Sequence, residues 1–91
     1  MLTRDARLKI PEQVVTRQVG DETVLLNLES GTYFGLDPVG SRFLELLQAE
    51  GALAAVIARM LEEFEVTEAQ LEADLLRLAD EMLASSLLEP A

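Results

Sequence analysis

Carboxylates and hydroxyls are the side chains of this sequence that could take part in chemistry. The 91-residue chain has 17 Asp and Glu residues but neither His nor Cys, which excludes an imidazole base, a thiolate nucleophile and a zinc finger. Glu62, Glu63 and Glu65 could formally supply an acid–base pair, but Glu62 and Glu63 are neighbours on the outer face of an amphipathic helix, where charges are normally solvated. Ser41, Ser85 and Ser86 have no His partner.

No other pattern in the sequence indicates a reactive centre. There is no Gly-rich phosphate loop, and no spacing of carboxylates is typical of a magnesium site. We therefore expect no catalytic residue, no metal and no cofactor.

The charge balance limits the classes of partner. Seven basic residues against 17 acidic ones give a net charge of −10, which disfavours nucleic acid and anionic membranes. The longest uncharged apolar-rich stretch, residues 51–58, is far shorter than a membrane span. The N-terminus also lacks the apolar region of a signal peptide, so we expect a cytoplasmic protein.

Residues 13–36 predict three short antiparallel strands. Val15, Arg17 and Val19 follow a period of two, which is typical of a strand, and Gly20-Asp21 suits a two-residue hairpin turn. Two further strands are predicted on either side of a turn centred on residues 29–31. The predicted strands cover residues 13–19, 22–28 and 32–36.

The hydrophobic period then changes to that of helices. Asp37-Pro38 predicts a helix start, because Asp can accept free N–H groups and Pro fits the first turn, and Gly51 predicts its end. The second helix has no polar cap, whereas Thr67 and Gln70 form a capping box at the start of the third. The predicted helices cover residues 38–50, 52–64 and 68–85.

Three strands followed by three helices predict one α+β domain of winged helix-turn-helix-like architecture. We expect residues 1–12 to be a flexible, solvated lead-in and residues 13–91 to form the domain. A winged helix suggests DNA binding, but the third helix carries many acidic residues against Arg77 alone. A winged-helix DNA-binding regulator is therefore an alternative that the charge does not favour.

Two features fit peptide binding better. The third strand is last in the meander and should lie at a sheet edge, where an added strand can pair with it. The apolar sector of the third helix spans about 160° by helical geometry, wider than packing on one neighbour requires. That sector could line a groove, be buried within this domain, or form the interface of a structural homodimer. Its residues are Leu71, Leu75, Leu76, Leu78, Ala79, Met82 and Leu83.

The stretch TVLLNLESGTYFGLDPVG, residues 23–40, resembles the PqqD-like family, and most closely the small B1 proteins of lasso-peptide biosynthesis. The later pattern agrees: an apolar helix ending in LEEF at residues 61–64, then Val66-Thr67, then a Leu-rich helix closing at Leu87-Leu88. The resemblance extends over residues 13–88. The uncapped second helix departs from the pattern of many relatives.

The resemblance implies a recognition element, not an enzyme, that binds the leader segment of a ribosomally made precursor peptide. The leader would add as a strand beside the third strand and pack on the third helix. The implied partners are a leader-cleaving cysteine peptidase of the B2 type and, indirectly, an ATP-dependent macrolactam cyclase. Apolar and aromatic leader anchors would occupy a shallow pocket.

The same resemblance assigns residues to the peptide site. Gly35 can also be interpreted as a bulge or a close backbone approach. Spacing does not decide which helical residues face the groove and which face the core. The expected site comprises backbone pairing at Thr32, Tyr33, Phe34, Gly35 and Leu36, apolar contacts among Leu71, Leu75, Leu78 and Met82, and flanking charges at Asp74 and Arg77.

Overall fold

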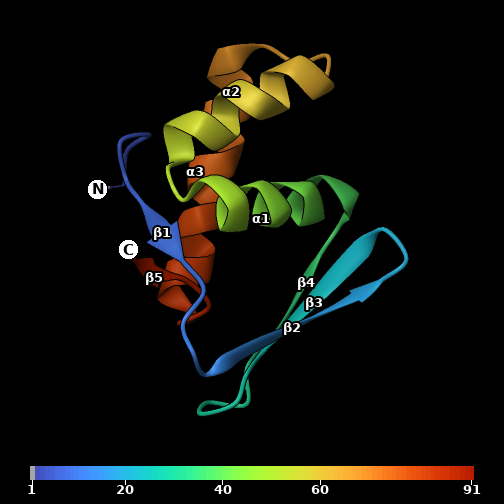
Figure 1. The fold of residues 1–91 in the computed structure, drawn as a ribbon, viewed down its shortest axis with the longest axis vertical. Helices are drawn as coiled ribbons and strands as arrows, with labels where there is room; N and C mark the ends of the chain where they lie inside the picture. The colour runs from blue at the N-terminus through green and yellow to red at the C-terminus, as the bar shows by residue number, and fades with distance from the viewer. Residues whose placement is uncertain (1) are drawn as a thin grey trace.

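The computed structural model describes residues 2–91, in which a three-stranded meander is followed by three helices (Figure 1). The antiparallel strands lie in the order β2-β3-β4. This arrangement confirms the predicted α+β class. The elements are β2 (Val14–Val19), β3 (Glu22–Asn27), β4 (Tyr33–Leu36), α1 (Pro38–Glu50), α2 (Leu53–Glu63) and α3 (Glu68–Ala84). Within residues 2–91, no helix is long and apolar enough to cross a membrane.

The sheet has one covered face and one open face. On β3, Thr23, Leu25 and Asn27 are buried, whereas the side chains between them are only half-buried. This alternation arises because successive side chains of a strand point to opposite faces. Helix α1 packs against β3 and β4 on the covered face, and the helices lie to one side of the sheet (Figure 1).

The side chains predicted to cap α1 and α3 do so, but one of the two hydrogen bonds of the predicted capping box is missing. The carboxylate of Asp37 accepts a hydrogen bond from the Gly40 N–H at 2.7 Å, and the Thr67 hydroxyl accepts one from the Gln70 N–H at 3.2 Å. The second half of the predicted capping box does not form. The Gln70 amide donates instead to Asp74 Oδ1, at 2.9 Å.

The N-terminal segment supplies the cap that α2 lacks. Ala52 caps α2 without a side-chain hydrogen bond, but the N–H of Leu53 donates to the Ala6 carbonyl at 3.0 Å. The Leu8 N–H likewise donates to the Gly51 carbonyl at 3.0 Å. The segment before the sheet thus satisfies backbone groups at the α1–α2 junction.

The prediction of a flexible lead-in over residues 1–12 is wrong for its second half. Strand β1 (Leu8–Lys9) pairs antiparallel with β5 (Glu89–Pro90), and the two lie side by side in Figure 1. Leu8 is only 3% exposed. Apolar burial and backbone pairing with distant residues hold this segment, and neither leaves a local signal. Met1, the first residue of the expected lead-in, lies outside the described residues.

We predict that Leu8→Ala destabilises the domain by about 2–4 kcal/mol, because it leaves a cavity in the core. Urea unfolding followed by circular dichroism measures the loss. Lys9→Ala, next to it on the exposed side of β1, is the matched control and should change the free energy of unfolding little. Equal effects of the two substitutions would contradict the burial of Leu8.

Candidate functional site

A groove of about 540 Å³ lies between the edge strand β4 and helix α3. The start of α1 closes one side of it, because Asp37-Pro38 begins that helix directly after the strand. The groove therefore combines main-chain groups of a sheet edge with side chains of a helix. Its lining residues are Phe34, Gly35, Leu36, Asp37, Val39, Gly40, Asp74, Leu75, Leu78 and Glu81.

The outer edge of β4 offers free main-chain groups at alternate residues. The Asn27 N–H donates to the Thr32 carbonyl at 2.9 Å, and bonded pairs alternate with non-bonded pairs along an antiparallel ladder. Since Leu25 pairs with Phe34 and Leu26 with Tyr33, the N–H and C=O groups of Phe34 point toward β3. Those of Tyr33 therefore point away from the sheet, and those of Gly35 do the same.

The five expected residues of the third strand thus divide into two sets. Phe34 and Leu36 direct their main chains toward β3, and Leu36 is buried. The Thr32 carbonyl also faces β3, whereas the Thr32 N–H donates to Ser30 Oγ at 3.3 Å. Tyr33 and Gly35 are exposed, and the side chain of Tyr33 is 71% accessible. Of the five residues, only Tyr33 and Gly35 present both their N–H and their C=O group to an incoming strand.

The apolar line expected on α3 divides in the same way. Leu75 and Leu78 line the groove; Leu78 is half-buried, whereas Leu75 is only 3% exposed and also belongs to the core. Leu71 and Met82 are not among the lining residues and are 5% and 0% exposed. They belong to the core, as does Ala79. Burial inside the domain therefore accounts for much of the wide apolar sector.

The charged groups of the groove are acidic. Asp37, Asp74 and Glu81 line it, and no Lys or Arg is among its lining residues. Arg77, expected to flank the helix line, lies outside the lining and donates to Asp74 at 3.0 Å. The groove thus presents an apolar floor with carboxylates beside it.

Sequence reasoning missed part of the lining. Asp37, Val39 and Gly40 follow directly from the tight junction between the third strand and the first helix, a junction that the sequence did predict. Glu81 is seven residues after Asp74, so the two lie on one helical face with Leu78 between them. That spacing was the available signal.

Glu63 of α2 lies on the exposed surface, as expected, and in addition pairs with a residue of α1. The guanidinium of Arg42, on α1, donates to the Glu63 carboxylate at 2.6 and 2.8 Å and also bonds Glu45. The hydrogen bond from Arg42 lowers the pKa of Glu63 below its usual value. This contact links α1 to α2 and lies on the solvent side of both helices.

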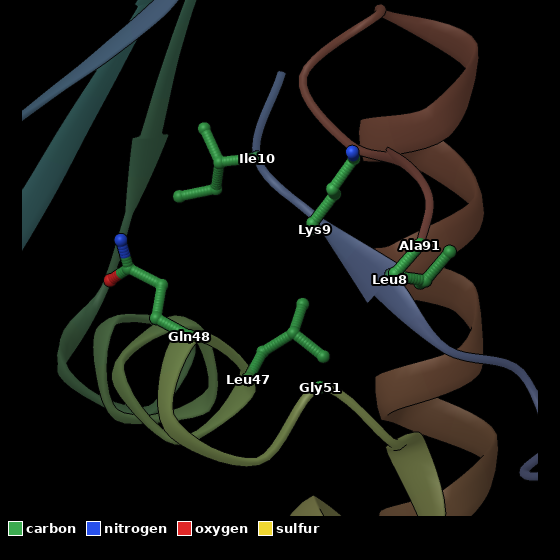
Figure 2. A pocket seen from close by; sticks show the side chains of 7 residues that line it. All are labelled: Leu8, Lys9, Ile10, Leu47, Gln48, Gly51 and Ala91. Carbon is green, nitrogen blue, oxygen red and sulfur yellow. The ribbon is translucent and has the colours of Figure 1, made fainter. Parts of the chain in front are cut away.

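Among residues 2–91 there is no cluster of three acidic side chains placed to hold a metal ion. A second hollow, of about 330 Å³, lies between β1, α1 and the C-terminal residue (Figure 2). The side chains of Ile10 and Leu47 point into the space between the N-terminal segment and α1. None of the expected site residues lines this hollow.

The buried amide of Asn27 fixes the end of the sheet to the end of α3. Its Nδ2 donates to the Ser86 carbonyl at 2.9 Å, and its Oδ1 accepts from the N–H groups of Glu29 and Ser30 at 2.9 and 3.1 Å. The side chain is 2% exposed. One residue therefore shapes the β3–β4 turn and sets where α3 ends beside the sheet.

Comparison with known proteins adds two findings. Residues 22–88 match the family described as coenzyme PQQ synthesis protein D, PqqD. The solved structure of TbiB1 in complex with the TbiA(beta) leader peptide is similar to this fold, with a TM-score of 0.85 and 38% sequence identity. The similarity covers 89% of this chain and 94% of that one. No curated protein matches significantly.

We predict that Asn27→Ala lowers the free energy of unfolding by about 1–3 kcal/mol, because it removes three part-buried hydrogen bonds that join the β3–β4 turn to the end of α3. Chemical denaturation measures this change. Glu29→Ala, in the same turn but exposed, keeps the three hydrogen bonds and should have a small effect. A stability of Asn27→Ala within error of the parent protein would show that the buried amide contributes little.

The burial of Leu75 generates a second prediction. Its side chain is 3% exposed, so Leu75→Asp would place an unpaired charge in the core and should unfold the domain. Loss of the helical circular dichroism signal is the expected result. Asp74→Asn, at the neighbouring exposed position, should stay folded. A folded Leu75→Asp variant would show that this leucine faces solvent in the groove.

Proposed function

The chain belongs to the PqqD family, and from this premise we propose that it binds the leader segment of a ribosomally synthesised precursor peptide. The groove between the free edge of β4 and α3 is the observation that carries the proposal. The similarity to TbiB1, solved with a leader peptide, supports it. The sequence resemblance to B1 proteins favours a precursor of the lasso-peptide class.

The mechanism that we propose is strand addition to β4. Tyr33 and Gly35 would each donate one N–H and accept at one C=O, so the leader would pair in a fixed register. Phe34 and Leu36 would contribute through their side chains, because their main-chain groups already face β3. Main-chain pairing would supply direction and register, and side-chain contacts would supply sequence preference.

Leader side chains on the α3 side of the added strand would reach the floor of the groove. Leu78 is half-buried and Val39 is 43% exposed there, so both have apolar surface to cover. A few such anchors usually carry most of the affinity of an interface. Asp74 and Glu81 would favour a leader whose flanking residues are not acidic, because like charges repel.

The proposed role is presentation of the precursor without catalysis by this chain. The absence of His and Cys from the sequence supports a division of labour in which a leader-cleaving cysteine peptidase supplies the nucleophile. A macrolactam cyclase would act downstream. The bound leader would hold the cleavage site close to the peptidase and raise its effective concentration.

Strand addition predicts a specific effect of proline at the β4 edge. Tyr33→Pro removes an outward N–H without breaking the β3–β4 ladder, so the domain should fold while its affinity for the leader falls by about tenfold or more. Fluorescence anisotropy measures this affinity, using a labelled leader peptide of a lasso-peptide precursor. A scrambled leader serves as the peptide control.

Thr16→Pro is the matched protein control. Thr16 lies on β2, at the opposite edge of the same sheet, and its N–H also points outward, because Leu28 N–H donates to the Gln13 carbonyl and bonded pairs alternate from there. Thr16→Pro should leave the affinity for the leader unchanged. Equal affinities of both proline variants would reject pairing at β4. Failure of the folded parent protein to bind the leader would reject the function and favour a homodimer or another partner.

A further inference from the structure

Gly35 has no reason within this chain to be glycine. Its φ is not positive, and the ladder continues through it from Tyr33 to Leu36 without a bulge. A Cβ at this position would lie in open space, with no heavy atom within 4 Å beyond its chain neighbours. The interpretation of Gly35 as a bulge or as a close approach within the chain is therefore wrong.

A glycine within a strand lowers stability by about 0.5–1 kcal/mol relative to alanine. No backbone conformation and no packing contact within residues 2–91 requires a glycine at position 35. The vacant space beside Gly35 is therefore an unexplained feature of the β4 edge. Glycine in a strand is also found where a ligand approaches closely. The position of Gly35, at the proposed edge of strand addition, fits that case.

A shallow hollow of about 370 Å³ adjoins Gly35 on the sheet face that carries no helix. Val24 lies directly opposite Gly35 in the ladder, and Val19 lies opposite Glu22 in the next strand pair. These side chains share one face, because paired residues of neighbouring strands point to the same side. The hollow thus has a partly apolar floor, and Glu22 and Asp37 are also among its lining residues.

A strand added to β4 would place every second side chain over this open face. The residue opposite Gly35 would have its Cβ about 4.5–5.5 Å from the point where a Cβ of residue 35 would stand. With no side chain at Gly35, a large group there could lie across the glycine and reach Val24. Cross-strand coverage of an edge glycine by an aromatic side chain is a known way to stabilise a sheet.

We propose that Gly35 forms a subsite for one large apolar side chain of the leader strand, on the open face of the sheet. This subsite lies on the other face of β4 from the groove beside α3, although Gly35, Leu36 and Asp37 line both hollows. The leader would therefore make side-chain contacts on both faces of its strand. The inference rests on the proposed function. The occupant is a leader and not a second copy of this chain, because each copy carries a charge of −10 and two copies repel.

Gly35→Ala tests the subsite. The domain should stay folded and be at least as stable, because the new methyl group meets open space and restricts the unfolded chain. Leader affinity, measured by fluorescence anisotropy, should fall by about tenfold, the size expected when a methyl group overpacks an interface. Gln18→Ala, on the far strand β2, is the matched control and should bind as the parent protein does.

Two further arms make the outcome decisive. An alanine scan of the leader should identify one large apolar residue whose truncation weakens binding to the parent protein. The leader truncated at that residue should bind the parent protein and Gly35→Ala with equal affinity. Val24→Thr, which keeps the shape of the floor but adds a hydroxyl, should weaken binding severalfold.

Equal binding by the parent protein, Gly35→Ala and Val24→Thr would overturn the subsite while leader binding stands. Failure of the folded parent protein to bind would instead reject the proposed function, and the subsite with it. Self-association of the parent protein in sedimentation, abolished by Gly35→Ala, would assign the vacant space to a second copy and also overturn the proposal.

Discussion

The buried amide of Asn27 is the contact on which the geometry of the groove depends. Its three hydrogen bonds join the last residue of β3, the turn that leads to β4 and the carbonyl of Ser86 at the end of α3. A buried amide must satisfy both its N–H and its C=O groups, so these three segments have one favourable arrangement. These hydrogen bonds tie the start of the edge strand to the end of the helix, so they help to set the separation between the two sides of the groove.

The N-terminal segment performs a similar task at the other end of the helices. Helix α2 begins without a polar cap, and the Ala6 carbonyl accepts from its first free N–H group. Leu8 then fills the core beside the end of the chain, where Leu87 and Leu88 are also buried. The weak helix start is thus compensated by tertiary contacts. A chain of this size has few core residues to spare, so even its ends contribute to the core.

The site is built from features that a monomeric domain would normally avoid. An uncovered strand edge invites pairing with other chains, and a glycine within that strand weakens it. Both occur together at β4, next to exposed apolar surface at Tyr33 and Val39. A net charge of −10 offsets the risk of self-association. These features are consistent with an edge kept free for a peptide of a different chain.

The sequence alone determined the three strands of the meander and the three helices, because their signals are local. The period of two, the Asp37-Pro38 start, the Gly51 end and the Thr67 cap depend on neighbouring residues, and the resemblance over residues 23–40 placed the family. Only the tertiary structure decided which leucines of α3 face the groove, because one wide apolar sector packs against several elements at once. It also decided that Leu8 is buried and that the space beside Gly35 is empty, since both depend on residues far away in the chain.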